Sequence, residues 1–292
     1  TTVRGRKDLK KLIVPFLGEI PYYVSRKNRP TLKQRIRFWK KPKEVCQIVV
    51  KAGKRNIVNE AFRVLRTNFE FTIGTHPEQN VIVFTSLNPG SGKTHLAANM
   101  AMSLAIKKKK VLLIDGDLRH GSTSMLVGSP GEGLSDYLNG RIADIHDILH
   151  KGEESGLVKY FDVIPIGTIP PNPTELLFTP LLEQMIRQMR QEYDYVFIDC
   201  PPIEVVADTP IYEQFADRTI FVVRAGLMER SMLPEIDALY KEKKFKNMTM
   251  ILNATKARGG RYGSHYGYGY GYGYGYGYNY NKEKNGGGQN LK

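Results

Sequence analysis

The stretch from residue 81 to 94, VIVFTSLNPGSGKT, constrains this chain more than any other. A β-branched apolar run leads into a Gly-rich turn, and Lys93 and Thr94 then open an apolar helical pattern. A strand, an anion-cradling loop and a helix N-terminus in this order are typical of a site for a nucleoside triphosphate. The strand before such a loop is expected to be buried and parallel to its neighbours. The stretch therefore predicts an α/β fold with a mostly parallel central sheet.

The loop supplies the first set of candidate nucleotide-binding residues. Its glycines let backbone amides face a bound phosphate, Lys93 would reach the β- and γ-phosphates, and Thr94 would offer a hydroxyl to Mg²⁺. The one departure from the general pattern is Leu87, which stands where that pattern begins with Gly. The predicted nucleotide-binding residues of the loop are Asn88, Pro89, Gly90, Ser91, Gly92, Lys93 and Thr94.

Carboxylates follow two further apolar strands, predicted at residues 111–114 and 195–198. Asp115 and Asp117 follow the first strand, and Asp199 follows the second. Ligands bind outside the carboxyl ends of strands in open parallel sheets, so these side chains are expected to face the phosphate loop. Beside a triphosphate, carboxylates hold Mg²⁺ or take a proton from an attacking hydroxyl, a role open to Asp115 or Asp117. The candidate metal ligands are Thr94, Asp115 and Asp199, and the candidate catalytic residues are Lys93, Asp115, Asp117 and Asp199.

Three more polar residues stand where they could touch a nucleotide. Arg119 follows the first pair of carboxylates, and Arg224 and Asn253 end strands predicted at 220–223 and 248–252. A structural role explains Arg224 and Asn253 equally well. A further strand is predicted at 161–166, and helices are predicted at 174–190, 210–215 and 233–240.

A helix is also predicted to begin after Asn56, whose side chain can cap it. Apolar residues follow at helical spacing. Glu60, Arg63 and Arg66 lie three residues apart, so they share one polar face of that helix. Judged from spacing alone, such a set usually consists of solvent-exposed charges without a specific role.

Positive charge is concentrated at the start of the chain. Residues 1–55 hold 17 of the 43 Lys and Arg residues and only three acidic ones, so this segment accounts for the net charge of +14. A basic block suits phospholipid headgroups or nucleic acid, or is a solvated charged arm. Nucleic acid is disfavoured, because the few aromatic residues show no stacking pattern or docking motif.

The chain as given is expected to be soluble and to be cut from something longer. No apolar run approaches the roughly 18 residues that a membrane span needs. The sequence begins with Thr1 and has no secretory signal. Cys46 and Cys200 stand in unrelated contexts and are interpreted as reduced thiols of a cytosolic protein.

From Lys256 onward the sequence cannot form a core. Alternating Gly is expected to keep the backbone disordered and the Tyr rings exposed. The segment is either a low-complexity tail or a multi-site phosphoacceptor, and its roughly 35 residues give a flexible coil a reach of about 30 Å. The candidate phosphoacceptors are Tyr262, Tyr266, Tyr268, Tyr270, Tyr272, Tyr274, Tyr276, Tyr278 and Tyr280.

Together, three nucleotide motifs and a terminal tyrosine cluster resemble the bacterial tyrosine kinases of polysaccharide export. Residues 86–94 resemble the Walker A motif of that family, 111–119 its Walker A′ motif and 195–202 its Walker B motif. Glu60, Arg63 and Arg66 match its Glu-x-x-Arg-x-x-Arg subunit-contact helix. The resemblance implies a P-loop NTPase-like three-layer sandwich, with a basic juxtamembrane segment at 1–55, a kinase domain at 56–255 and a tyrosine tail at 256–292.

The resemblance also implies an activity and partners. The chain would use Mg·ATP to phosphorylate its tail in trans within a ring-like homo-oligomer. It would lie at the cytoplasmic face of the bacterial inner membrane, held by a missing transmembrane part and the basic segment. The polysaccharide export machinery and a cognate tyrosine phosphatase would be its partners, and nucleic acid would not.

Two other functions compete with this interpretation. Cell-division and plasmid-partition ATPases share the fold and the first aspartate, and they would act as ATP-hydrolysing switches. Their phosphate loop has Lys followed by Gly where this chain has Asn88 and Pro89, and they lack a tyrosine tail. The third possibility is a non-catalytic scaffold whose basic arm and tail bind partners.

Overall fold

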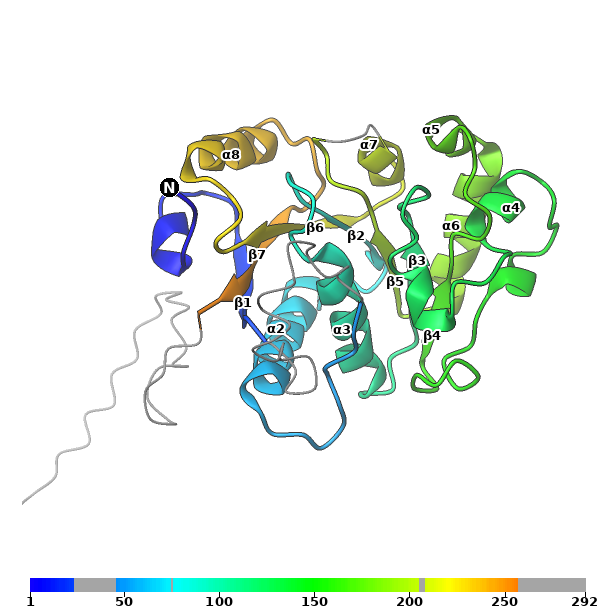
Figure 1. The fold of residues 1–292 in the computed structure, drawn as a ribbon, viewed down its shortest axis with the longest axis horizontal. Coiled ribbons are helices and arrows are strands. Elements are labelled where there is room, and N and C mark those ends of the chain that lie inside the picture. Colours follow the sequence, from blue (N-terminus) through cyan, green and yellow to red (C-terminus); the bar gives the residue numbers. More distant parts are fainter. Residues whose placement is uncertain (24–45, 75, 205–207, 257–292) are drawn as a thin grey trace, which may run out of the picture. The chain divides into compact units, whose positions relative to one another are not determined.

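A seven-stranded parallel sheet, in the order β1-β7-β6-β2-β5-β3-β4, forms the centre of the computed structural model (Figure 1). The structure describes residues 1–23, 46–74, 76–204 and 208–256. Every pair of neighbouring strands runs parallel. The strands are β1 (Phe16–Pro21), β2 (Val81–Thr85), β3 (Val111–Asp115), β4 (Phe161–Ile164), β5 (Tyr195–Asp199), β6 (Arg218–Arg224) and β7 (Thr249–Thr255).

Helices cover both faces of this sheet, which confirms the predicted three-layer sandwich. Side chains alternate between the faces of a strand. Ile82 and Phe84 of β2 therefore pack with α2 and α3, whereas Val81 and Val83 pack with α4, α6 and α7. The α-helices are α2 (Ile57–Ile73), α3 (Lys93–Ala105), α4 (Leu134–Leu138), α5 (Pro173–Leu176), α6 (Pro180–Glu192), α7 (Asp208–Glu213) and α8 (Leu233–Lys241). Short 3₁₀ turns are η1 (Arg6–Leu9), η3 (Ser124–Val127), η4 (Ile145–Ile148) and η5 (Arg230–Met232).

The start of the chain contributes an edge strand to the sheet. β1 pairs with β7, and Phe16 lies opposite Met250. Gly18 lies close to α2, because a Cβ at this position would come within 2.9 Å of the end of the Leu65 side chain. Residues 1–257 form one compact unit, so the division predicted at residue 56 marks a change of composition inside that unit.

The prediction of a single helix over residues 174–190 is wrong. Two helices, α5 and α6, occupy this stretch. Thr179 between them has φ −74° and ψ 146°, because Pro180 disfavours the helical conformation in the residue before it. Pro180 then begins α6, where its missing N–H has no helical partner to lose.

Helix α2 begins as predicted, because the Asn56 side chain accepts a hydrogen bond from the backbone N–H of Asn59. Its three predicted contact residues differ in environment. Arg66 is buried and donates from Nη1 to the carbonyl oxygen of Ser103 on α3, at 2.9 Å. Arg63 is partly exposed and pairs with Glu60 at 2.7 Å. Arg66 therefore joins two helices of one chain, whereas Glu60 and Arg63 remain on the surface.

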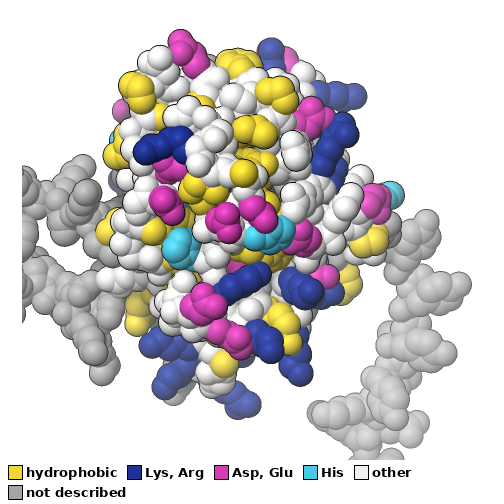
Figure 2. Space-filling model, turned by 90° about the vertical axis from the view of Figure 1, so that its right-hand side faces the viewer, with side chains coloured by type: hydrophobic (Ala, Val, Ile, Leu, Met, Phe, Trp, Pro, Cys, Tyr) yellow, Lys and Arg dark blue, Asp and Glu magenta, His cyan; other side chains and the backbone are white. Residues whose placement is uncertain are grey.

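Charged side chains gather on part of the face that carries α4 and α6 (Figure 2). Acidic and histidine side chains gather across the middle of this face, with Lys and Arg below them (Figure 2). In this part of the fold, His146 contacts Asp144 at 2.8 Å and Glu192 at 3.0 Å. Within the described ranges, no helix combines the length and apolar character that crossing a bilayer requires.

Candidate active site

The phosphate loop connects β2 to α3 and is held by its own hydrogen bonds. The Ser86 and Ser91 hydroxyls both donate to the carbonyl oxygen of Asn88, at 2.8 and 2.7 Å. Gly90 and Gly92 adopt φ of 74° and 87°, a left-handed conformation that favours glycine. Leu87, the departure from the general pattern, is fully buried in the apolar cluster that contains Phe221 and other residues of β6 and β7.

Two of the predicted strand-end residues hold the backbone of this loop. Arg224 ends β6 and donates to the carbonyl oxygen of Gly90, at 2.5 Å. Asn253 of β7 donates from Nδ2 to the carbonyl oxygen of Ser91, at 2.9 Å. Both side chains are therefore next to the loop, where they support its shape.

Gly92→Ala is expected to weaken nucleotide binding at least ~10-fold, because a Cβ at this position would lie 2.2 Å from Asn253 Nδ2. Relieving that overlap must displace either the loop or the side chain that supports it. Titration with a fluorescent ADP analogue measures the effect. Gly128→Ala is the matched control, since Gly128 also has a positive φ, of 80°, but open space around it. Equal losses in the two variants would contradict the proposed contact.

Two aspartates meet at the carboxyl ends of β3 and β5. Asp115 and Asp199 are paired neighbours in the sheet, with 0% and 2% of their surface exposed. Asp115 Oδ2 accepts hydrogen bonds from the Ser124 N–H and hydroxyl, both at 2.7 Å. Asp199 Oδ2 accepts one from the Thr123 hydroxyl at 2.9 Å. The other oxygen of each carboxylate, Oδ1, has no hydrogen-bond partner among the described residues.

Burial of these carboxylates perturbs their ionisation. It raises the pKa of Asp115 to about 8, and the negative charge of Asp199 adds to this effect. Burial likewise raises the pKa of Asp199, against the opposing effect of the Lys93 ammonium. Burial lowers the pKa of Lys93, while the Asp199 carboxylate acts in the opposite direction. Two buried carboxylates so close together favour a cation between or beside them.

The donor set fits Mg²⁺ that is shared with nucleotide phosphates. Asp115 and Asp199 each offer a buried oxygen without a partner, and the Thr94 hydroxyl is a hard oxygen donor at the start of α3. Over the described ranges, no three His, Cys, Asp or Glu side chains group closely enough to hold a metal ion by themselves. Mg²⁺ is commonly held by one or two carboxylates together with phosphates and water, which agrees with this arrangement.

Asp117 lies beyond the end of β3 and is more accessible than Asp115, with 16% of its side chain exposed. The backbone N–H of Arg119 donates to Asp117 Oδ1 at 3.2 Å. His120 Nδ1 lies 3.0 Å from Asp117 Oδ2. His120 is not among the predicted site residues, although its position three residues after Asp117 was a usable signal.

Arg119 does not join the phosphate loop. Its guanidinium forms an ion pair with Asp208, the first residue of α7, and donates to the Thr174 hydroxyl at 2.9 Å. The structure therefore places this predicted nucleotide-binding side chain between α5 and α7. Asp208 and Thr174 were not identified from the sequence.

Comparison with known proteins connects this site to an enzyme family. A family model described as an AAA domain matches residues 79–228. Tyrosine-protein kinase CpsD of Streptococcus agalactiae is 33% identical over 208 residues, which cover 70% of this chain and 87% of CpsD. The chain belongs to the bacterial tyrosine kinase family.

The fold comparison agrees with this assignment to the tyrosine kinases. The kinase domain of Escherichia coli tyrosine kinase ETK aligns with a TM-score of 0.74 and 28% identity, over 92% of this chain and all of that one. The putative tyrosine-protein kinase AmsA of Erwinia amylovora is 37% identical over 183 residues, 62% of this chain but only 24% of AmsA. The chain thus spans most of some family members and about a quarter of others.

The predicted subunit-contact and phosphoacceptor residues of this tyrosine kinase domain are not part of the candidate active site. Glu60, Arg63 and Arg66 are on α2, and the nine tail tyrosines lie outside the described residues, as does the basic stretch 24–45. Cys46 and Cys200 are free thiols, as predicted. Burial raises the pKa of Cys46 to about 12, which keeps this thiol protonated at neutral pH.

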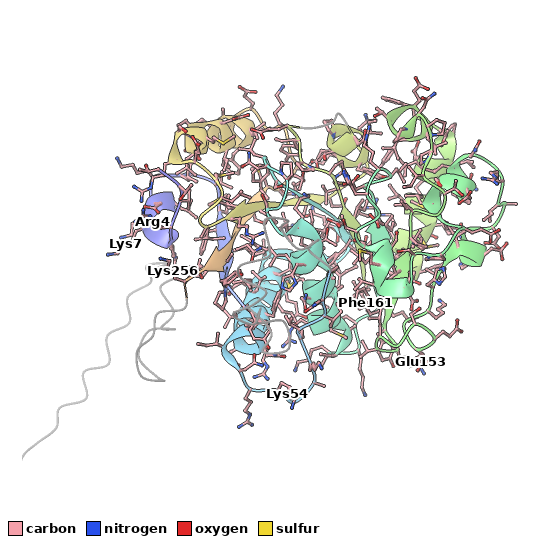
Figure 3. All side chains as sticks on the ribbon, viewed as in Figure 1. Arg4, Lys7, Lys54, Glu153, Phe161 and Lys256 are labelled. Atoms are coloured by element: carbon pink, nitrogen blue, oxygen red, sulfur yellow. The ribbon has the colours of Figure 1, made fainter. Side chains whose placement is uncertain are left out.

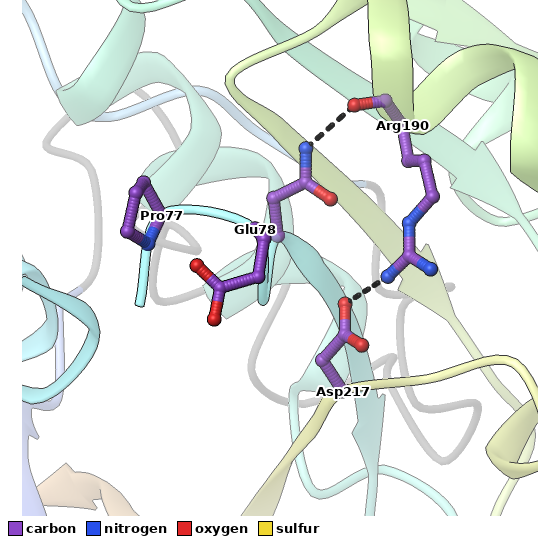
Figure 4. A pocket seen from close by; sticks show the side chains of 5 residues that line it. Pro77, Glu78, Arg190 and Asp217 are labelled. Carbon is purple, nitrogen blue, oxygen red and sulfur yellow. Dashed lines mark hydrogen bonds and ion pairs between the residues drawn. The ribbon is translucent and has the colours of Figure 1, made fainter. Parts of the chain in front are cut away.

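A cavity of about 390 Å³ lies at the opposite edge of the sheet from the phosphate loop, before the start of β2 and β6 (Figure 4). Arg190 donates to Asp217 there at 2.5 Å. Asn80 and Glu78 line the same cavity. This cavity is separate from the candidate active site.

Proposed function

We propose that this domain transfers the γ-phosphoryl group of Mg·ATP to tyrosines of the 256–292 tail. The observation that supports the proposal is the pair of buried carboxylates, Asp115 and Asp199, each of which has one buried oxygen without a hydrogen-bond partner among the described residues. Family membership supplies the reaction class. The nine tyrosines supply an acceptor within the same chain.

The proposed chemistry assigns one task to each residue. The loop amides and Lys93 bind the phosphates and stabilise the charge that develops on them. Asp115, Asp199 and Thr94 would hold Mg²⁺, which neutralises phosphate charge when it is bound. The tyrosine oxygen forms a bond to the γ-phosphorus as the bond to ADP breaks, and the phenolic proton passes to Asp117. Asp117 suits this role better than Asp115 because it is accessible and Asp115 is buried.

The place where the tail leaves the fold bears on which site it enters. Lys256 follows β7, on the same side of the domain as Arg4 and Lys7 (Figure 3). β6, β2 and β5 separate β7 from β3, a lateral distance of about 19 Å at the usual strand spacing. Six extended residues span about 20 Å, so Tyr262 barely reaches its own Asp117, whereas tyrosines farther along the tail have enough chain to reach it. Tail length therefore permits transfer within the chain as well as between chains. We propose that the tail is phosphorylated in a neighbouring subunit, as the family resemblance implies.

Lys93→Met is expected to abolish phosphotyrosine formation, because Lys93 is the cation that contacts the transferred phosphate. The measurement is mass-spectrometric mapping of phosphotyrosine after incubation with ATP and Mg²⁺. Wild-type label should lie between residues 262 and 280. Label elsewhere would remove the tail from the proposal, and unchanged labelling of Lys93→Met would remove the mechanism. Release of inorganic phosphate without phosphotyrosine would instead favour an ATPase switch.

We further propose that the exposed face of α2 binds a second copy of the chain in a ring-like homo-oligomer. Besides Glu60 and Arg63, this face carries an apolar stripe at seven-residue spacing. Ile57, Val64 and Phe71 are 44%, 40% and 80% exposed. A stripe of this kind on a soluble surface indicates a contact with another protein.

Phe71→Glu is expected to produce a monomer by light scattering without loss of thermal stability, since the ring is 80% exposed. Arg66→Ala should behave in the opposite way. It removes a buried charge-assisted hydrogen bond, at a cost of about 1.5–3 kcal/mol in the free energy of unfolding. An oligomer that survives both Phe71→Glu and Arg63→Ala would refute the α2 contact.

Some relatives are much longer than this chain, which covers only 24% of AmsA. We propose that the basic segment places the domain at the cytoplasmic face of the bacterial inner membrane. The polysaccharide export machinery and a cognate tyrosine phosphatase would be its partners there. Cosedimentation with anionic and neutral vesicles tests the membrane part, since only anionic lipid should retain a basic segment.

A further inference from the structure

Helix α7 carries a buried carboxylate that is directed at the Walker A′ loop, residues 115–121. Asp208 is fully buried. It pairs with the guanidinium of Arg119 and accepts a hydrogen bond from the Thr174 hydroxyl at 2.6 Å. Thr174 in turn accepts a hydrogen bond from Arg119 at 2.9 Å. Three segments that are far apart in the chain therefore meet at Asp208.

The first turn of α7 is fixed to the sheet. The buried Thr209 hydroxyl donates to the carbonyl oxygen of Pro201, which follows the Walker B aspartate, at 2.9 Å. The Thr85 hydroxyl, at the end of β2, donates to the same carbonyl oxygen at 3.0 Å. Asp208 is thus attached to a rigid point between the strand that leads into the phosphate loop and the strand that ends in Asp199.

The same helix also contacts the Walker A′ loop directly. A Cβ at Gly116 would lie 3.3 Å from the Tyr212 ring, and 3.0 Å from the carbonyl oxygen of Asp199. The loop therefore passes tightly between α7 and the end of β5. A side chain at this position would require the loop or its neighbours to shift by a few tenths of an ångström.

Arg119 connects this support to the candidate base. Its side chain is anchored at Asp208, while its backbone N–H donates to Asp117 Oδ1 at 3.2 Å. The N–H groups of His120 and Gly121 donate to the carbonyl oxygen of Asp117, at 3.1 and 3.2 Å, and close the turn. A displacement of the Arg119 side chain would therefore move the amide that orients the Asp117 carboxylate.

A buried ion pair is a poor means of gaining stability, because desolvation of the two charges offsets their attraction. Here the pair has a geometric consequence instead. We propose that Asp208 is a positioning residue for phosphoryl transfer, which acts through Arg119 to hold Asp117 at the acceptor tyrosine, with Thr174 as the second point of attachment. The inference rests on the proposed kinase function. None of these side chains contacts the phosphate loop in the hydrogen bonds of the described residues, so we expect nucleotide binding to be little affected.

Asp208→Ala tests this role when kcat and the KM for ATP are measured separately. Misplacement of a reacting group by about 1 Å costs up to about 100-fold in rate. The expected result is a kcat reduced about 10- to 100-fold, with the KM for ATP and the affinity for a fluorescent ADP analogue within about threefold of wild type. Asp208→Asn keeps an acceptor for Arg119 and should be intermediate.

Asp217→Ala is the matched control, because it removes the aspartate of the Arg190 pair at the far edge of the sheet (Figure 4). It should lower the melting temperature and leave kcat unchanged. If Asp208→Ala has wild-type kcat, or loses no more than Asp217→Ala, the inference is overturned. A wild-type chain that forms no phosphotyrosine would instead overturn the proposed function itself.

A double variant separates positioning from stability. Arg119→Met alone leaves the Asp208 carboxylate buried without its cation, so it should have the lowest melting temperature of the set. Adding Asp208→Ala removes that charge and should restore much of the melting temperature while kcat stays low. Recovery of kcat together with the melting temperature would show that the pair is purely structural and would refute the positioning role.

Discussion

Asp115→Asn is expected to abolish phosphotyrosine formation and at the same time to stabilise the nucleotide-free domain at pH 8. Asp115 has an unfolded-state pKa near 3.8 and a folded-state pKa raised to about 8, chiefly by burial. The folded state therefore binds more protons, and the contribution of this group to stability is lost as the pH rises from about 4 to about 8. Asn carries no charge to bury.

The gain in the free energy of unfolding should be on the order of a few kcal/mol at pH 8 and small at pH 4. Thermal unfolding of wild type and variant at both values measures it. Kinase activity should fall about 100-fold or more, as expected for loss of a group that supports a metal. A variant less stable than wild type at pH 8 would contradict the burial argument.

Asp162→Asn provides the comparison, because Asp162 is also buried, at 6% exposure, but both of its oxygens accept hydrogen bonds. It accepts hydrogen bonds from Tyr193 at 2.7 Å and from the Gly152 N–H at 3.0 Å, and it pairs with Lys151. This substitution should lower stability and leave activity unchanged, the reverse of Asp115→Asn in both respects.

A chain that ends at Ala257 is expected to lose more than about 90% of its phosphotyrosine and to keep its melting temperature. Residues 258–292 form a separate unit from 1–257, so their removal leaves the core contacts intact. Phosphotyrosine per chain and thermal unfolding are the measurements. Half of the eight other tyrosines are poor acceptors, since Tyr137, Tyr193, Tyr195 and Tyr212 are buried.

Mixing the truncated chain with full-length Lys93→Met decides between transfer within and between chains. The truncated chain is active but has no acceptor, and the variant has the acceptor but is inactive. Label on the Lys93→Met tail is the expected outcome. Its absence would mean that each tail enters its own site, and label retained on the truncated chain, for example at the exposed Tyr22 or Tyr23, would show that the tail is not the main acceptor.

Much of the site was predictable because its residues form contiguous motifs. Lys93 and Thr94 follow the strand that positions them, and Asp115 and Asp199 end buried strands whose carboxyl ends face one edge. Local sequence and strand order are sufficient for these positions. The positions of these four residues could be predicted without knowledge of side-chain contacts.

The support of the Walker A′ loop was not predictable in the same way. Arg119 and Asp208 are 89 residues apart, and Thr174 lies on a third segment. Any of several carboxylates could have paired with Arg119, so its position after Asp117 did not identify Asp208 as its partner. The break between α5 and α6, by contrast, had a local signal in the sequence, because Pro180 disfavours a helical residue before it. The helical spacing of the apolar residues favoured a single helix instead.

The parallel pairing of β1 with β7 places the last residues of the two strands next to each other. Pro21 lies opposite Thr255, and the Tyr22 N–H donates to the Thr255 carbonyl oxygen at 2.8 Å. Residues 24–45, with nine Lys and Arg and one Glu, and the tyrosine tail therefore start as neighbours. Tethered segments meet at effective concentrations in the millimolar range, and each phosphotyrosine adds about −1.5 to −2 charges. An attraction between the basic segment and the phosphorylated tail would therefore be independent of protein concentration and would weaken with salt. Phosphorylation would also change the net charge at this corner of the domain.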